Sequence, residues 1–152
     1  MTVKSPDTSA DGLQQLRQLL ASGRQPPIGE LMGFSLDEIS LGRAVFVGTP
    51  GPQHYNPIGS VHGGVAATLL DSACGCAVHS RLSVDQAYTT LELKVAYHRG
   101  MTAATGRVRA IGTVLSMGRR VAFTEAKLLD DQDRLLASAT STLLVMERPS
   151  EK

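Results

Sequence analysis

The residue in this sequence whose type and position most clearly suggest a chemical role is Asp71, a carboxylate within an otherwise apolar stretch. Between Val65 and Val78 the clearly polar side chains are those of Thr68, Asp71 and Ser72. Asp is a weak helix former, and burial of an unpaired carboxylate is costly. Asp71 therefore lies either on a solvated helix edge or at a functional site. A carboxylate in a cleft with apolar neighbours is the type of group that acts as a general base or nucleophile.

A second feature, His62-Gly63-Gly64, lies where the apolar stretch begins. The first N–H groups of a helix have no partner inside the helix and carry positive partial charge. Because glycines let a ligand approach these donors closely, they could bind the oxyanion that forms in an acyl transfer. An ordinary glycine turn at the start of a helix is the alternative interpretation.

Asn56 lies in the loop before this helix, close to Pro57 and Gly59. Its amide could orient a water molecule or hold a substrate carbonyl. The alternative is a turn residue, because Asn suits turns for purely local reasons.

The spacing of Gly63 and Asp71 constrains any site that uses both. They are eight residues apart, which is about 12 Å of helix at about 1.5 Å per residue. An oxyanion donor must lie about 3 Å from its oxygen, and a nucleophile within about 3.5 Å of the carbonyl carbon. One helix cannot easily bring both to the same carbonyl group. If both are catalytic, they come from different subunits, which predicts a two-fold dimer with two equivalent shared sites.

The surrounding pattern predicts the elements that position these residues. Four leucines at helical spacing indicate a helix over 11–22, after an N-terminus (1–10) that we expect to be disordered. Pro26-Pro27 then breaks the chain. Further along we expect a proline- and glycine-rich loop at 49–60 and a buried helix over 65–78, capped by Ser60 or by the glycines. The expected strands are 34–39, 43–47, 88–97, 103–115, 120–130 and 135–146.

Four long strands joined by short turns favour an antiparallel sheet. Its apolar face must be covered, and one long apolar helix is available to cover it. The sequence thus predicts an α+β fold in which an antiparallel β-sheet wraps around one long central helix. We expect a domain over 28–147, preceded by a tail and short helix (1–27) and followed by a tail (148–152).

Composition narrows the class of protein. A chain of 152 residues with 42 % apolar residues fits one domain. Its net charge of +1 gives no indication of the basic surface that a nucleic-acid binder needs. No apolar run approaches the roughly 20 residues of a membrane span, and the polar N-terminus has no signal-peptide core. We therefore expect a cytoplasmic protein. Cys74 and Cys76 would point about 200° apart on a helix, which disfavours a disulfide, and the histidine spacing suggests no metal site.

The run from Asn56 to Asp71, NPIGSVHGGVAATLLD, resembles the signature of hotdog-fold acyl-CoA thioesterases of the phenylacetate-degradation type, relatives of the 4-hydroxybenzoyl-CoA thioesterases. Residues 89–97, 118–123 and 134–140 resemble strands of that family, and the similarity extends over about 28–147. Lys94 and Gly100 depart from it, since Asn and Pro are common at these positions.

The resemblance implies a hotdog fold and hydrolysis of an acyl-CoA thioester to a free acid and CoA, without a cofactor. It implies that Asp71 is the nucleophile or the base that activates water, and that the Gly63 N–H, with Gly64, forms the oxyanion hole. His62 and Asn56 would position the thioester or water. Thr90, on the strand facing the helix of the other subunit, would assist the carboxylate or the water.

The same resemblance implies a homo-oligomer, a dimer or dimer of dimers. The CoA phosphates need a basic, exposed lip, for which Arg119 and Arg120 beside Gly118 are candidates, with Arg99 and Arg107 as further ones.

Two other functions stay open at this level. A hotdog hydratase or dehydratase would use His62 to move a proton at carbon. A non-catalytic acyl-CoA-binding module would use the same cleft without cleaving the thioester. Neither the acyl group nor the choice between nucleophilic and general-base attack follows from the sequence.

Overall fold

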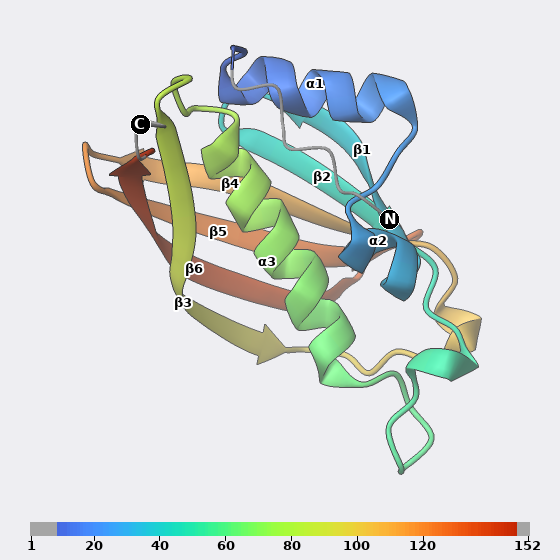
Figure 1. The fold of residues 1–152 in the computed structure, drawn as a ribbon. Helices are drawn as coiled ribbons and strands as arrows, with labels where there is room; N and C mark the ends of the chain where they lie inside the picture. The colour runs from blue at the N-terminus through green and yellow to red at the C-terminus, as the bar shows by residue number, and fades with distance from the viewer. Residues whose placement is uncertain (1–8, 149–152) are drawn as a thin grey trace.

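One long helix packs against one face of a six-stranded antiparallel sheet in the computed structural model, which describes residues 9–148 (Figure 1). The strand order is β1-β2-β4-β5-β6-β3, so β1 and β3 form the two edges of the sheet. This arrangement confirms the predicted hotdog fold.

The helices are α1 (Gly12–Ser22), α2 (Pro27–Met32) and the central α3 (Gly63–His79). The strands are β1 (Phe34–Ser40), β2 (Arg43–Gly48), β3 (Gln86–Tyr97), β4 (Val108–Met117), β5 (Val121–Asp130) and β6 (Leu135–Glu147). None of the helices in residues 9–148 is long and apolar enough to cross a membrane.

Two expectations about the elements were wrong. The strand expected from residue 103 begins at Val108, because Ala103–Thr105 form a 3-10 turn that is followed by Gly106 at φ 76°. Helix α2 was not expected, since Pro26-Pro27 was read only as a break. Proline fits the first turn of a helix, where its missing N–H has no partner to lose. The expected disorder of 1–10 lies mostly outside the described residues, as does most of the C-terminal tail.

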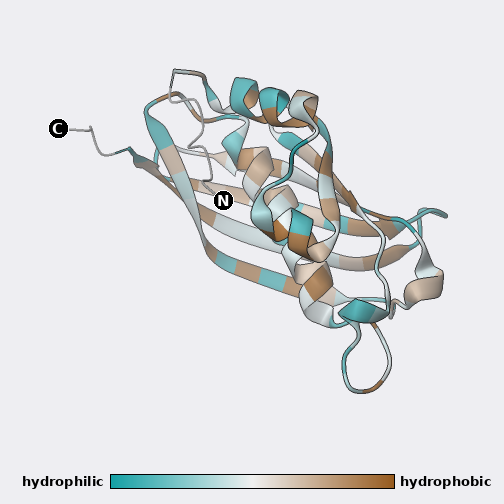
Figure 2. Ribbon diagram, turned by 45° about the vertical axis from the view of Figure 1, so that its right-hand side comes forward, coloured by the Kyte–Doolittle hydropathy of each residue, from teal (hydrophilic) through white to brown (hydrophobic). Residues whose placement is uncertain are grey.

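The core lies between α3 and the inner face of the sheet. Nine residues of α3 are buried, and along β5 buried residues alternate with exposed ones, as expected for a sheet with one face on the core. Figure 2 shows this pattern, with α3 mostly white to brown and colours that alternate along the strands. One edge of α3, which carries Gly64, Ala67 and Asp71, stays only half-buried. The single chain therefore does not enclose α3 completely.

Helix α3 comes close to the sheet at Gly112 of β4. A Cβ atom at this position would lie 2.4 Å from the carbonyl carbon and oxygen of Ala73, so the helix backbone would have to move. We expect Gly112→Ala to lower the free energy of unfolding by about 2–3 kcal/mol. Urea denaturation measures the loss. Gly100→Ala is the control, because a Cβ at Gly100 has no atom within 4 Å; a comparable loss there would contradict the steric explanation.

Helix α1 is held against the C-terminal end of α3 by polar contacts. The Gly12 N–H donates to the carbonyl oxygen of Leu82 (3.0 Å), and His79 Nε2 lies 3.0 Å from Gln15 Oε1. Burial of the imidazole, and then the charge of Arg148, lower the pKa of His79 below its usual 6.5.

This lowered pKa makes stability depend on pH in a defined direction. Below about pH 6.5 the unfolded chain binds a proton at His79 that the folded chain does not yet bind, so the free energy of unfolding falls as the pH falls. We expect His79→Gln, which can still donate to Gln15, to lose less stability than wild type between about pH 7.5 and pH 5.5. Urea denaturation at both pH values tests this; equal losses in the two proteins would contradict it.

Candidate active site

The side chain of Asp71 is half-buried on the edge of α3 that faces β3. The Thr90 hydroxyl donates a 3.0 Å hydrogen bond to Asp71 Oδ1, which leaves Oδ2 for another partner. Both residues belong to the same chain. Thr90 thus contacts the carboxylate of its own subunit, and the expectation that its strand faces the helix of the other subunit stays a prediction.

A β-bulge in β3 directs Thr90 toward the helix. Thr90 pairs with Leu143 and Glu92 pairs with Thr142, so Leu91 is an extra residue in β3. A bulge reverses the alternation of side chains beyond it, and bulges often re-aim a side chain beside a functional site.

The bulge allows Thr90, Leu93 and Val95 to lie on the side of β3 that faces α3. Leu93 and Val95 pack against the main core, while Glu92 and Lys94 are exposed. With strict alternation from Thr90, the exposed Glu92 and Lys94 would lie on the helix side in place of Leu93 and Val95. The sequence analysis assumed a regular alternation of side chains along this strand and did not predict the bulge.

At the N-terminus of α3, His62 is the N-cap residue, in place of the expected Ser60 or glycines. Its Nδ1 accepts a 2.8 Å hydrogen bond from the Gly64 N–H, and its carbonyl oxygen accepts one of 3.0 Å from the Val65 N–H. Since Nδ1 acts as an acceptor, the proton of the neutral imidazole is assigned to Nε2. Within residues 9–148 the Gly63 N–H has no acceptor, so this amide is the open donor of the first turn.

Tyr97, at the end of β3, lies directly against this turn. Its hydroxyl donates a 2.9 Å hydrogen bond to the Gly63 carbonyl oxygen. A Cβ atom at Gly63 would lie 3.0 Å from the Tyr97 ring. The sequence analysis did not single out Tyr97, because its contact with Gly63 joins residues 34 positions apart. No local sequence pattern indicates such a contact.

The amide of Asn56 organises its own loop. Its Oδ1 accepts hydrogen bonds of 3.1 Å from the N–H groups of Ile58 and Ser60, and its Nδ2 donates to Ser60 Oγ at 3.1 Å. One N–H of the amide is left for a ligand.

Arg119 and Arg120 are exposed in the turn between β4 and β5. Within residues 9–148, no hydrogen bond or ion pair joins them to Asp71 or Gly63. Of the other basic candidates, Arg107 lies 3.4 Å from Asp37.

The cysteines near Asp71 are neutral thiols. Both are free, with Cys74 buried and Cys76 half-buried. Burial, and then the negative charge of Asp71, raise the pKa of Cys76 to about 12, and burial raises the pKa of Cys74 to about 11. The thiols therefore do not compete with Asp71 as nucleophiles. In residues 9–148 no cluster of three or more His, Cys, Asp or Glu side chains could hold a metal ion.

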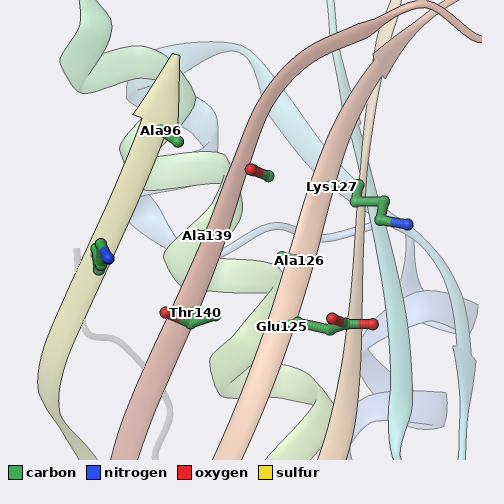
Figure 3. A pocket seen from close by; sticks show the side chains of 8 residues that line it. Ala96, Glu125, Ala126, Lys127, Ala139 and Thr140 are labelled. Carbon is green, nitrogen blue, oxygen red and sulfur yellow. The ribbon is translucent and has the colours of Figure 1, made fainter. Parts of the chain in front are cut away.

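The larger of two described cavities, about 320 Å³, lies on the face of the sheet away from α3 (Figure 3). Its polar lining comes from β3, β5 and β6: Lys94, Glu125, Lys127, Ser138 and Thr140. The second, about 10 Å³, lies between Met32, Phe34, Val65 and Leu69. Neither is lined by Asp71 or Gly63, so neither joins the two halves of the candidate site.

A family model described as Thioesterase superfamily matches residues 58–137. The 1,4-dihydroxy-2-naphthoyl-CoA hydrolase of Listeria monocytogenes is 25 % identical over 119 residues, which cover 78 % of this chain and 95 % of the relative. A Halobacterium salinarum protein, whose name assigns it provisionally to the esterases, is 38 % identical over 84 residues. That match spans about half of each protein, 54 % of both.

Solved structures are similar over most of the chain. A thioesterase family protein of Silicibacter pomeroyi has a TM-score of 0.78 and 26 % identity, over 90 % of this chain and 99 % of its own. A mutant of the phenylacetic acid degradation protein PaaI of Thermus thermophilus has a TM-score of 0.71 and 28 % identity, over 78 % of this chain and 98 % of its own.

Proposed function

Because the chain belongs to the thioesterase superfamily, we propose that it hydrolyses acyl-CoA thioesters, with Asp71 as the catalytic carboxylate. The observation that carries this proposal is the hydrogen bond from Thr90 to Asp71. This bond holds the half-buried carboxylate in a fixed orientation and leaves its second oxygen, Oδ2, available for the reaction.

In the general-base form of the reaction, Oδ2 of Asp71 takes a proton from a water molecule whose oxygen attacks the thioester carbonyl carbon. The carbonyl oxygen becomes an oxyanion and is stabilised by the open Gly63 N–H. When the tetrahedral intermediate collapses, the C–S bond breaks, and CoA leaves as a thiolate that takes up a proton. The acid and CoA are the products.

In the nucleophilic form, Asp71 attacks the carbonyl carbon directly, and water then hydrolyses the resulting anhydride. Label found in the Asp71 carboxylate after a single turnover in H₂¹⁸O would identify the nucleophilic form. The product acid carries ¹⁸O if water attacks the thioester, and also if water attacks the anhydride at the acyl carbon. The label enters the Asp71 carboxylate if water attacks the anhydride at the aspartyl carbon.

The site needs two copies of the chain. Gly63 and Asp71 lie about 12 Å apart along one helix, too far to act on the same carbonyl. The edge of α3 that carries Asp71 is only half-buried, and the 12-residue strand β3 forms an edge of the sheet. A long unpaired edge strand is a template for pairing with another chain. We therefore propose a two-fold dimer, alone or within a tetramer, in which Gly63, His62 and Asn56 of one subunit face Asp71 and Thr90 of the other.

The remaining roles follow from the available donors. The proton on Nε2 of His62 and the unused amide N–H of Asn56 would hold the thioester carbonyl or water. The Gly64 N–H, which is bound to His62 Nδ1, supports the turn instead of the oxyanion. Arg119 and Arg120 stay candidates for the CoA phosphates, and a cytoplasmic location stays a prediction.

Release of free thiol from a panel of acyl-CoAs tests the function. The panel contains phenylacetyl, hydroxybenzoyl, 1,4-dihydroxy-2-naphthoyl, and short and medium alkyl thioesters. Cleavage of at least one member supports the proposal, and the best substrate defines the acyl class. If CoA binds while no thioester is cleaved, the binding-module interpretation replaces it. Addition of water across an acyl double bond without thiol release would favour a hydratase.

A further inference from the structure

We infer that Tyr97 is a positioning residue that fixes the Gly63 peptide and, across a two-fold axis through Lys94, packs beside Thr90 and Asp71 of the partner subunit. This inference rests on the proposed function for the role of Gly63. The geometric part does not require catalysis and is tested without it.

Contacts between α3 and β3 mark two levels along the strand. The Thr90 hydroxyl binds Asp71, and the Tyr97 hydroxyl binds the carbonyl oxygen of Gly63. Along β3, Thr90 therefore lies at the level of the Asp71 carboxylate, and Tyr97 lies at the level of Gly63, the oxyanion donor. If Gly63 of one subunit faces Asp71 of the other, Thr90 must lie opposite the partner's Tyr97.

This requirement determines the register of the two β3 strands. Leu91 is the extra residue of the bulge, so the path from Thr90 to Tyr97 has six regular steps instead of seven. The midpoint is three steps from either end, at Lys94. A two-fold axis perpendicular to the sheet therefore passes between the two copies of Lys94.

The register is consistent with the two faces of the strand. Opposed residues in an antiparallel pair share a face of the sheet, and here Thr90 and Tyr97, which both contact α3, oppose one another. Exposed Glu92 lies opposite exposed Ala96 in the same way. On the outer face the two Lys94 ammonium groups would repel each other, but each lies diagonally from the partner's Glu92, within reach of a long side chain.

Exposure of β3 agrees with a partner on this edge. Leu91 and Tyr97 are each 58 % exposed in the single chain. The pairing would bring the ring of Tyr97 against the partner's Thr90 and so remove apolar surface from water.

Tyr97 would then act on both halves of the shared site. The peptide before Gly63 is held by the bond from the Val65 N–H to the His62 carbonyl oxygen. The peptide after Gly63 is held at one end by His62 Nδ1 and at the other by the Tyr97 hydroxyl. Loss of that hydroxyl would let the turn rotate and move the open N–H away from the developing oxyanion.

The register is tested by a cysteine scan of the outer face. Glu92→Cys, Lys94→Cys and Ala96→Cys are oxidised or treated with a short bismaleimide, with wild type as the background for Cys74 and Cys76. Directly opposite Cβ atoms lie about 5 Å apart, so Lys94→Cys is expected to form a covalent dimer. The copies of residue 92, like those of residue 96, would be offset by four residues, about 13 Å, and are expected to stay uncrosslinked. Cross-linking strongest at 92 or 96, or at none of the three, would overturn the register.

The positioning role is tested with Tyr97→Phe, which keeps the ring and removes the hydroxyl. We expect kcat to fall about tenfold while KM stays within about twofold, because the oxyanion forms only in the transition state. Tyr55→Phe is the control, since the Tyr55 hydroxyl also bonds a backbone group, the Ala103 N–H at 2.8 Å.

The outcomes separate the inference from the proposed function. An unchanged kcat in Tyr97→Phe, or an equal fall in Tyr55→Phe, overturns the positioning role while the wild type still cleaves thioesters. A wild type without thiol release overturns the proposed function and with it the role of Tyr97 in catalysis. The register is still decided by the cysteine scan.

Discussion

Replacement of Asp71 by Asn is expected to lower kcat for thioester cleavage by a factor of about 10²–10⁴, the usual contribution of a positioned base. Asn has nearly the same shape, and its Oδ1 can still accept the hydrogen bond that Thr90 donates to Asp71. The change therefore removes the charge and the basic oxygen while leaving the packing of α3 against β3 intact. Substrate binding should change little, so KM is expected to stay close to that of wild type.

The measurement is thiol release with the best acyl-CoA of the panel, together with the oligomeric state and thermal unfolding of the variant. Ser72→Ala is the matched control, because Ser72 is the next residue of α3 and is also half-buried; its activity is expected to stay near that of wild type. If Asp71→Asn retains full turnover, Asp71 is only a tolerated helix residue, and the mechanism fails. If the variant loses its oligomeric state, the loss of turnover would not be evidence for a catalytic role.

The elements around the site could be predicted because their signals are local. The apolar run after Gly64 indicated a central helix, and the observed α3 (Gly63–His79) contains the whole of the expected range 65–78. The strands expected over 34–39 and 43–47 correspond to β1 (Phe34–Ser40) and β2 (Arg43–Gly48). Both patterns depend on neighbouring residues and on periodicity, which a single sequence contains.

The features that were missed depend on contacts between distant residues. The bulge at Leu91 has no signature in β3 alone, because its effect is defined by the pairing with β6. The bond from Tyr97 to Gly63 exists only once β3 lies beside α3. His62 was considered for catalysis rather than for capping, since capping by an imidazole is less common than by Ser, Thr, Asp or Asn.

Gly63→Ala is expected to lower kcat by about 10²–10³, the cost of losing one oxyanion donor. The added Cβ would lie 3.0 Å from the Tyr97 ring, so either the tyrosine or the first turn of α3 must shift. A shift of the turn carries the Gly63 N–H away from the oxyanion, and a shift of the tyrosine releases the carbonyl that its hydroxyl holds. In both cases the transition state loses more than the ground state, so KM should change less than kcat.

The matched control is Gly75→Ala on the same helix. A Cβ there would also lie 3.0 Å from a tyrosine of β3, at the hydroxyl of Tyr88, but Gly75 is in the helix interior, where its N–H is not an open donor. Both variants disturb the contact of α3 with β3 to a similar degree, whereas only Gly63→Ala disturbs the open amide. Gly75→Ala is therefore expected to cost less than about tenfold in kcat. If the two variants lose turnover equally, the loss arises from displacement of β3, and the Gly63 N–H is not the oxyanion donor.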